Sequence, residues 1–450
     1  MKSTGFSRGD FLYSNSFYGL LGTIFLNSSF TDEFYSPKIV EDILLGHKDK
    51  AEFIDMSALI ELRSKYHSEL FDKFLPNMDK LIIDHDIGGF MCDIDNKKGK
   101  LLSTKKRAWF EGRGIWLYSF LYNHFGNNPT YLEVATKSKN FILKHIPSDG
   151  SFWNSSFTKE GSPLPGKGDI FSNLYIAEGL AEYSKASGEI EYFNLAKKLL
   201  LQCVKEYDKE DYEYASEKSI KGPRVLNHWM IMLCNSTQML NYKEDSEIES
   251  LAKRCVDAIL NNHFNPDWQL LDVVLAHDLN RLSDREAAQK ISFGLGIQAL
   301  WMVLSEAVRR KDLTLFDKAK KLFKRHIEVA KDNVYGGYYW SIENISSNTY
   351  KLGKVLSLHD EVLIGSLLLV EHQADQWALD CFYETYSYIN NNFIKEGYVF
   401  PVENGDRKII DFSDKGMGIY HHPRQLVLNL QAIDRIINRK GEISHVFVRG

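Results

Sequence analysis

Two histidine-containing stretches carry the residue types that acid–base chemistry needs. GIYHHPRQL places His421 and His422 at the start of an amphipathic segment, with Arg424 close behind. KVLSLHDEVL places His359 two residues before Glu361. Histidine titrates near neutral pH and is the side chain best suited to moving protons there. One such histidine alone is more often structural, but two clusters on separate helices favour a functional role. We therefore predict His421, His359 and Glu361 as catalytic residues.

A third stretch, KKRAWFEGRGIWLYSFLY, is rich in arginine and tryptophan. Spacings of four and three place Trp109, Arg113 and Trp116 on one face of a helix, and Arg107 stands at its entry. Arginine beside tryptophan suits a neutral or anionic sugar, because the hydroxyls accept hydrogen bonds while an aromatic ring stacks on the sugar face. The alternative is an aromatic core stripe with a buried ion pair to Glu111.

Further polar groups stand at the starts of other predicted helices. In NHWMIML, Asn227 and His228 form a polar edge, whereas the methionines suit a core. His277 and Asp278 lie in the polar stretch AHDLNRLSDRE, which is more typical of a solvated loop. The complete set of predicted substrate contacts is Arg107, Trp109, Glu111, Arg113, Asn227, Trp301 and Arg424.

Composition and missing motifs exclude several classes of partner. The sequence contains no HExxH, CxxC, P-loop or strand-linked GxGxxG, so it indicates no metal, nucleotide or other cofactor. Net charge is only -5 and the basic residues are scattered, which argues against nucleic acid. The 5 cysteines are widely spaced and odd in number, so they are expected to be reduced and mostly buried. A small molecule is the expected partner, and a homodimer stays open.

The elements that must position these residues are helices. After residue 55 the chain shows amphipathic segments of helical period separated by short polar or glycine-containing connections. They span residues 57–84, 105–125, 129–146, 169–187, 190–208, 223–242, 245–263, 288–310, 312–332, 354–371, 373–391 and 423–439.

Six short aromatic stretches lie between pairs of these helices, near residues 88, 150, 212, 267, 336 and 398. They recur about every 60 residues, a spacing that equals one helical hairpin with its loops. Their strand-type residues, flanked by Gly or Asp, predict short β-hairpins. No helix pair buries its apolar face alone, so the pairs must pack on one another. We predict an all-α fold in which six pairs close into an (α/α)6 barrel over residues 57–440, followed by a tail at 441–450. An open solenoid is the alternative, but it needs polar caps that the sequence does not show.

The N-terminal segment resembles a signal for export. SRGDFLYSNSFYGLLGTIFLNSS has a charged start, an apolar run and small polar residues, and SRGDFL is similar to a twin-arginine signal with Gly9 in place of the second arginine. The apolar run is too short to span a bilayer. We predict an export-signal-like segment at 1–30, a linker or arm at 31–56, and a periplasmic protein that is not membrane-bound in mature form. The alternatives are a surface-docked arm and a cytoplasmic location.

The chain from about residue 60 to 440 resembles the N-acylglucosamine 2-epimerases, together with the cellobiose 2-epimerases and related sugar isomerases. KRAWFEGRGIWLYSFLY is similar to that family's K-R-x-W-x-x-G-R-x-x-W-x-Y, and GDIFSNLYIAEGLAEYSKASG to its I-F-S-x-x-F-x-A helix. KVLSLHDEVL is similar to K-x-W-W-x-H-x-E-A-L, and GIYHHPRQL to F-H-x-P-R, which places His421 at the position of a catalytic histidine. The resemblance also implies an (α/α)6 barrel.

One helix departs from the pattern of the cellobiose-type members. NPDWQLLDV followed by ISFGLGIQALW stands where those members carry D-W and then I-S-Y-G-H-D-I-E-A-x-W. Leu295 occupies the place of a second catalytic histidine, Gly296 that of an aspartate and Gln298 that of a glutamate. This stretch is therefore expected to be an altered catalytic helix.

The resemblance implies a carbohydrate epimerase or isomerase that removes a proton beside the carbonyl of an open-chain reducing sugar and returns it through an enediolate. Inverting a centre needs acid–base groups on both faces, whereas one base suffices for aldose–ketose isomerisation. Leu295 carries no proton, which tilts the expectation slightly towards isomerisation. Two alternatives remain: a sugar-binding relative with a degraded proton relay, and an (α/α)6 glycoside hydrolase or lyase, for which Glu111, Asp169, Asp360 and Glu361 are the candidate carboxyl groups.

Overall fold

The computed structural model describes residues 55–447, except for residues 96–99, 283–285, 396–397, 400–401, 404, 406–407 and 409–419. The chain divides into two units, Met1–Gly46 and His47–Gly450, and all described residues belong to the second. The predicted segments 1–30 and 31–56 therefore lie almost wholly outside the described residues. Among the helices that are described, none is long and apolar enough to cross a membrane.

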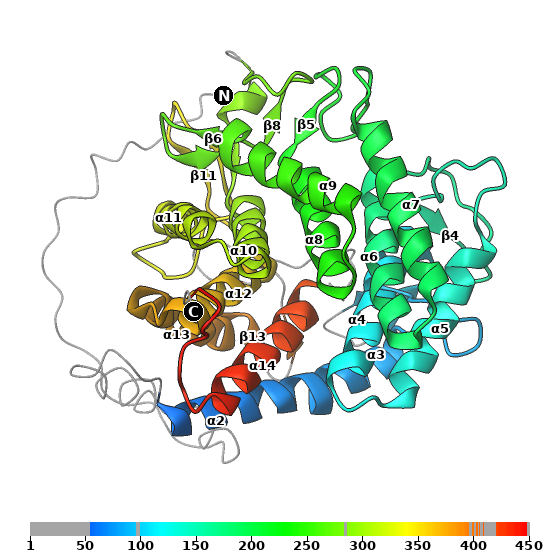
Figure 1. Ribbon diagram of the computed structural model, residues 1–450, viewed down its shortest axis with the longest axis horizontal. Coiled ribbons are helices and arrows are strands. Elements are labelled where there is room, and N and C mark those ends of the chain that lie inside the picture. The colour runs from blue at the N-terminus through cyan, green and yellow to red at the C-terminus, as the bar shows by residue number, and fades with distance from the viewer. Residues whose placement is uncertain are drawn as a thin grey trace, which may run out of the picture. The chain divides into compact units, whose positions relative to one another are not determined.

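Six helices form an inner ring (Figure 1). They are α4 (Ala108–His124), α6 (Ile170–Ser187), α8 (Leu226–Tyr242), α10 (Phe293–Arg310), α12 (Leu356–Gln373) and α14 (His421–Asn438). Each packs against the next, and α14 meets α4, so the ring closes. The predicted (α/α)6 barrel is thereby confirmed, and the open solenoid is wrong.

Outer helices return the chain between the inner ones. They are α5 (Pro129–Lys144), α7 (Ile190–Tyr207), α9 (Ser246–Asp257) extended by η3 (Ala258–Asn262), α11 (Leu313–Ala330) and α13 (Gln376–Asn392). The sixth outer position is filled by the first described helices, α2 (Met56–His67), η2 (Ser68–Phe74) and α3 (Leu75–Leu81), with α2 and η2 packing on α14. The last helix of the chain thus pairs with the first described one.

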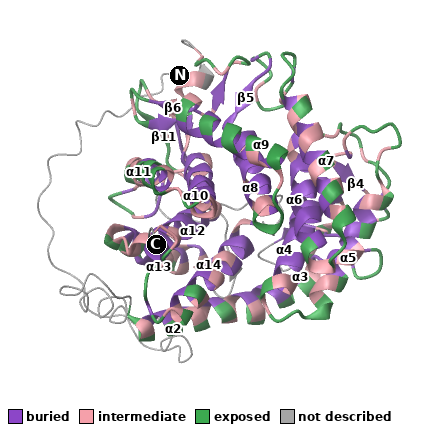
Figure 2. Cartoon of the chain, viewed as in Figure 1, coloured by how far each residue is buried: buried purple, intermediate pink, exposed green. Residues whose placement is uncertain are grey.

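Burial separates the two rings (Figure 2). The inner helices are buried along most of their length, while the outer helices alternate buried and exposed residues as amphipathic helices do. In α4, for example, every residue from Phe110 to Leu121 is buried. Polar side chains on the inner helices must therefore find partners inside the protein.

Very short strands fix where the inner helices begin. Strands β3 (Lys106–Arg107), β5 (Arg224–Val225), β9 (Ile291–Ser292) and β12 (Lys354–Val355) each stand directly before an inner helix. They pair respectively with β4 (Ser156–Phe157), β8 (Val274–Leu275), β10 (Ser341–Asn344) and β15 (Val402–Glu403). These four helices consequently begin later than the periodicity of the sequence predicts.

Hairpins occur at four of the six aromatic stretches. They are β1 (Asp93–Asp95) with β2 (Lys100–Ser103), β6 (Phe264–Asn265) with β7 (Leu270–Leu271), β10 with β11 (Thr349–Lys351), and β13 (Ile394–Lys395) with β14 (Tyr398–Val399). The stretch near residue 150 instead supplies β4, and the stretch near residue 212 forms turns. There the hydroxyl of Tyr212 donates to Nε2 of the buried His228 at 3.0 Å, so the Tyr212 side chain packs inward and the segment forms no strand pair.

Two of the connecting turns repeat one another closely. Asp84 accepts hydrogen bonds from the backbone at Asp86 and Ile87 and pairs with the buried Lys106 at 2.9 Å. Asp332 accepts from the backbone at Val334 and Tyr335 and pairs with the buried Lys354 at 2.9 Å. Both turns continue through two glycines with positive φ, Gly88 and Gly89 at 90° and 94°, and Gly336 and Gly337 at 76° and 70°.

This repeat assigns a structural role to Glu111 and His359. The residue after each glycine pair donates its backbone N–H to the inner helix 21 residues later: Phe90 to Glu111 at 3.0 Å, and Tyr338 to His359 Nε2 at 3.2 Å. His359 also bonds the Val355 carbonyl through Nδ1 at 2.8 Å. Burial lowers the pKa of His359 to about 3 and raises that of Glu111 to about 7.

The structure therefore places His359, predicted as catalytic, and Glu111, predicted as a substrate contact, in the support of two turns. Both side chains are 0% exposed and point away from the ring's interior towards an outer helix, where His359 stacks on Tyr388 of α13 and Glu111 accepts from Ser138 of α5. Their acceptor atoms hold a turn, and both ring nitrogens of His359 are occupied.

We expect His359→Ala to lower the free energy of unfolding by about 3 kcal/mol, because it leaves a buried N–H unpaired and opens a cavity. His359→Gln keeps an acceptor and should lose less. Urea unfolding measures both, with Glu111→Ala and Glu111→Gln as the equivalent pair in the other repeat. A His359→Ala protein of unchanged stability would contradict this assignment.

Candidate active site

The candidate site lies in the first turns and the middle of the inner helices. All six run in the same direction, because an outer helix returns the chain between them, so their N-termini share one rim. His421 begins α14, Glu361 lies in the second turn of α12, and Arg113 stands at the equivalent level of α4. Residues far apart in the sequence thus converge.

His421 and Glu361 form a dyad. The Nδ1–H of His421 donates to Oε1 of Glu361 at 2.7 Å, which fixes the ring orientation and leaves the proton on Nδ1. Nε2 of His421 makes no hydrogen bond to any described residue, and 28% of the side chain is exposed. The arrangement leaves the Nε2 lone pair available to accept a proton.

Two further side chains hold Glu361, and a third supports one of them. Arg424 pairs with its Oε1, and Trp301 donates Nε1–H to its Oε2 at 2.6 Å. Gln298 in turn accepts from both terminal nitrogens of Arg424, at 3.1 and 2.9 Å. Trp301 and Arg424 were predicted as substrate contacts. These polar atoms instead fix the carboxylate that orients His421.

The charges of the dyad follow from this network. Burial opposes the charge on Glu361, yet Arg424 and His421 outweigh it and hold the pKa of Glu361 below its usual value. Burial lowers the pKa of His421, and Arg424 and Arg113 add to that effect against the opposing attraction of Glu361. At neutral pH the site therefore holds a carboxylate and a neutral imidazole, which is the form that acts as a base.

The adjacent His422 has the opposite character. It bonds Asp360 through Nδ1 and Glu69 through Nε2, both at 3.0 Å. Although burial opposes its charge, these two carboxylates raise the pKa of His422 to about 10. His422 is thus a buried cation that ties α14 to α12 and η2, and only His421 of the pair is free to move protons.

An aromatic wall surrounds Arg113. Its guanidinium lies 4.1 Å from the ring centroid of Tyr175, 4.5 Å from that of Tyr420 and 5.3 Å from that of Trp109. Nε of Arg113 is buried and makes no hydrogen bond to a described residue. Tyr420 donates its hydroxyl hydrogen to Glu178. The predicted grouping of Trp109 and Arg113 with the histidine at residue 421 is consistent with this wall, since Tyr420 packs against His421.

Two predicted substrate contacts are engaged elsewhere. Arg107 lies at the rim and pairs with Asp93 of β1 at 2.5 Å, with 26% of its side chain exposed. Asn227 donates to the Tyr214 hydroxyl at 3.1 Å, and its oxygen faces Nδ1 of the buried His228 at 2.8 Å. Neither bonds a residue of the dyad or of the aromatic wall.

Sequence reasoning missed Tyr175, Glu178 and Tyr420. Tyr175 and Glu178 are three residues apart on α6 and therefore share a helical face, and Tyr420 directly precedes the histidine pair. Those spacings were the available signal, but aromatic residues on a buried helix are more often plain core.

The altered helix α10 brings no titratable group to this rim. Its first turn consists of Phe293, Gly294, Leu295 and Gly296, and Leu295 is half-buried. A Cβ at Gly296 would lie 2.5 Å from Cδ2 of His326, so a larger residue at this position would require His326 to move. Across the described part of the chain, no cluster of three or more His, Cys, Asp or Glu side chains could hold a metal ion.

Residues 88–421 match the family model described as N-acylglucosamine 2-epimerase (GlcNAc 2-epimerase). The N-acylglucosamine 2-epimerase of Bos taurus is 23% identical over 385 residues, covering 81% of this chain and 90% of the relative. Among solved structures, the cellobiose 2-epimerase from Bacillus thermoamylovorans superposes with a TM-score of 0.73 at 16% identity, covering 82% of this chain and 99% of that one.

A D-mannose isomerase structure superposes with a TM-score of 0.67 at 14% identity, covering 85% of this chain and 98% of that one. At such identities the solved structures show a shared fold, whereas the family match spans most of the chain and includes both Arg113 and His421. The chain belongs to the N-acylglucosamine 2-epimerase family.

Proposed function

We propose that the protein is a sugar isomerase or epimerase in which His421 moves a proton of an open-chain reducing sugar. Nε2 of His421 takes the proton from the carbon beside the carbonyl, the C–H electron pair forms the C=C bond of an enediolate, and the carbonyl oxygen takes the negative charge. For the aldose–ketose isomer, the proton returns to the neighbouring carbon, while the hydroxyl hydrogen on the first carbon passes to the oxyanion and that hydroxyl oxygen becomes the new carbonyl oxygen. For the epimer, the proton returns to the other face of the first carbon and the original carbonyl re-forms. The His421–Glu361 dyad is the observation that carries the proposal.

Arg113 is the group we assign to the developing oxyanion. Its guanidinium is buried among aromatic rings and its Nε lacks a partner among the described residues, so it retains a hydrogen-bond donor. A fixed donor in a site shielded from water stabilises charge that appears in the transition state more than it stabilises a neutral carbonyl. Trp109 beside it offers an indole face for the sugar ring.

The altered helix favours isomerisation over epimerisation. In a cis-enediol a single base can remove a proton from one carbon and return it to the next on the same face, whereas epimerisation needs a proton from the opposite face. Leu295 supplies none. The dyad and the altered helix together describe a one-base site.

The two alternatives receive no support from the described residues. For glycoside cleavage, Glu111 and Asp360 are buried and bonded within the fold, and Asp169 caps α6 by accepting from Ser172. For a binding protein with a degraded relay, the base and its carboxylate would be expected to have separated, but they bond at 2.7 Å. Export by the N-terminal segment and the choice of sugar stay proposals from the sequence alone.

The first prediction is that wild-type protein incubated in D2O with a panel of reducing mono- and disaccharides transfers deuterium to C2 of at least one of them. His421→Ala should slow this exchange by about 10² to 10⁴-fold. Leu295→Ala, on helix α10 of the same ring, is the matched control and should keep most of the rate. NMR at C2 measures all three proteins, and full exchange in His421→Ala would show that the base has been assigned wrongly.

The second prediction concerns pH. Because His421 must be neutral and burial lowers its pKa from the ordinary value of histidine, the rate should rise with pH on the acid side and be level at neutral pH. Glu361→Gln removes the charge that raises the pKa of His421, so the acid limb should move to still lower pH while the plateau falls by about 10²-fold or more. Rate–pH profiles of the two proteins test this, and an acid limb that moves to higher pH would contradict the dyad.

A further inference from the structure

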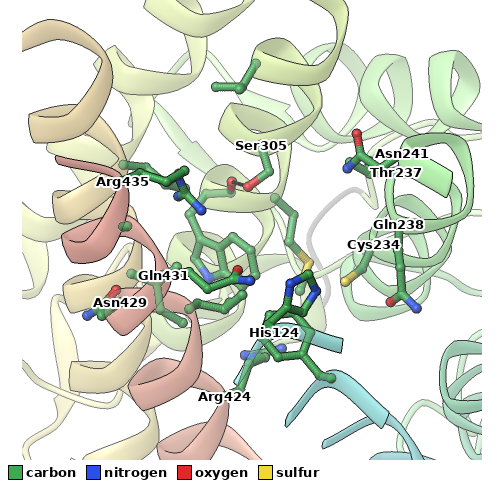
Figure 3. A pocket seen from close by; sticks show the side chains of 18 of the residues that line it. His124, Cys234, Thr237, Gln238, Asn241, Ser305, Arg424, Asn429, Gln431 and Arg435 are labelled. Carbon is green, nitrogen blue, oxygen red and sulfur yellow. Dashed lines mark hydrogen bonds between the residues drawn. The ribbon is translucent and has the colours of Figure 1, made fainter. Parts of the chain in front are cut away.

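A cavity of about 550 Å³ opens at the C-terminal ends of the inner helices, whereas His421 lies at their N-terminal rim. Figure 3 shows this cavity from close by. Residues from the C-terminal halves of all six inner helices line it, among them Phe120, Glu182, Gln238, Ser305, Leu368 and Gln431. The lining reaches the exposed side chains of Lys185, Asn241 and Tyr242, so the cavity is open to solvent. Its size suits a ligand of one or two sugar rings.

Aromatic and aliphatic side chains form most of its wall. Trp116, Phe120 and Trp301 contribute rings, and Met302, Leu368 and Leu428 complete the apolar surface. Aromatic walls of this kind receive the C–H faces of sugar rings as well as apolar ligands. The polar groups therefore decide between these two classes.

Polar groups without partners stand at both ends of the cavity. At the mouth, the side-chain amides of Asn241 and Gln431 make no hydrogen bond within the described part of the chain, and both lie among the labelled residues of Figure 3. At the inner end, Nε of Arg424 likewise makes no hydrogen bond to a described residue. Arg424 is only 1% exposed, so this nitrogen is buried without a partner in the described part of the chain. A buried donor without a partner is costly and points to a ligand atom or water.

Charged side chains of the lining have partners within the fold. Arg435 and Arg439 both bind Glu371, Glu178 accepts from Tyr420, and Arg424 pairs with Glu361. The cavity thus offers side-chain amides at its mouth and, at its inner end, the unpaired Nε–H of Arg424 beside aromatic rings. This combination suits a neutral ligand with several hydroxyl groups.

From this geometry we propose that the cavity is a second binding site, for a neutral saccharide of one or two rings, separate from the His421 site. The ligand packs against the rings of Trp116 and Trp301 and accepts a hydrogen bond from Nε of Arg424. At the mouth it forms hydrogen bonds with the side-chain amides of Asn241 and Gln431. Arg424 then touches the bound saccharide on one side and Glu361 on the other. The proposal does not depend on the activity proposed for the His421 site.

Methyl β-cellobioside and methyl β-glucoside allow binding to be measured without reaction, because their rings cannot open to a carbonyl form. Isothermal titration of the full chain with each should detect a binding component that Ser305→Trp weakens at least tenfold, since the indole fills the cavity. Ser250→Trp is the matched control. Ser250 is exposed on outer helix α9 and, like Ser305, bonds the carbonyl four residues earlier, at 2.9 Å against 3.1 Å.

Two smaller substitutions test the same binding in case Ser305→Trp fails to fold. Asn241→Ala and Gln431→Ala each remove one hydrogen bond at the mouth and should weaken the same component about 3 to 10-fold. Arg113→Ala, in the other site, should leave the component unchanged. This holds whether or not the protein exchanges protons of any sugar, so the two proposals can fail separately.

Three results would overturn the second site. The first is that neither glycoside binds the wild-type protein up to its solubility limit. The second is equal binding by Ser305→Trp and Ser250→Trp. The third is a component that disappears in Arg113→Ala but persists in Asn241→Ala and Gln431→Ala, which would place all saccharide binding at the His421 rim.

Discussion

The buried carboxylate of Glu361 is the group on which the centre of the barrel depends. It is 1% exposed, and a carboxylate buried to that degree keeps its charge only when cations and donors surround it. Arg424, Trp301 and His421 supply them, and Gln298 holds Arg424 in place. The same contacts that stabilise the charge also fix the tautomer of His421. The contacts that stabilise the Glu361 charge therefore also hold His421 in the form that accepts a proton. They join three helices, α10, α12 and α14.

The internal repeat explains which polar residues of the inner helices serve the fold and which serve the site. Glu111 and His359 occupy equivalent positions and accept a backbone N–H from a glycine turn. Two residues further along each helix, Arg113 and Glu361 are also equivalent, and both point into the ring. Two residues correspond to about 200° of helix rotation, so neighbouring polar residues necessarily face opposite sides. In each repeat one of them holds a turn against the outer helix and the other reaches the centre.

The closed ring was predictable from the sequence, because twelve amphipathic segments at a regular spacing have few ways to bury their faces. Residue type indicated His421 and Glu361 as candidates, and the resemblance to known motifs added to this. The sequence places Glu361 beside His359, however, and only the structure pairs it with His421. His359 was predicted as catalytic because a histidine in an H-D-E stretch suggests chemistry. Its helical phase relative to Glu361 instead turns it towards the outer helix α13. His421 and His422 show the same limit: adjacent in sequence, they differ because Asp360 and Glu69 approach one and solvent approaches the other. Such contacts join residues separated by 60 positions or more, and no local pattern contains them.

The central claim is that one base, His421, transfers a proton between neighbouring carbons on one face of the sugar. Supplying [2-²H]mannose and [2-²H]glucose in ordinary water, and analysing the ketose by NMR at low conversion, tests it most directly. If a single base takes the deuteron and returns it before exchange with water is complete, ketose should be the main product. Part of the deuterium should then be found at C1, in one of the two C1–H positions. A 2-epimer as the main product, carrying only solvent hydrogen at C2, would contradict the claim and require a second proton donor on the opposite face.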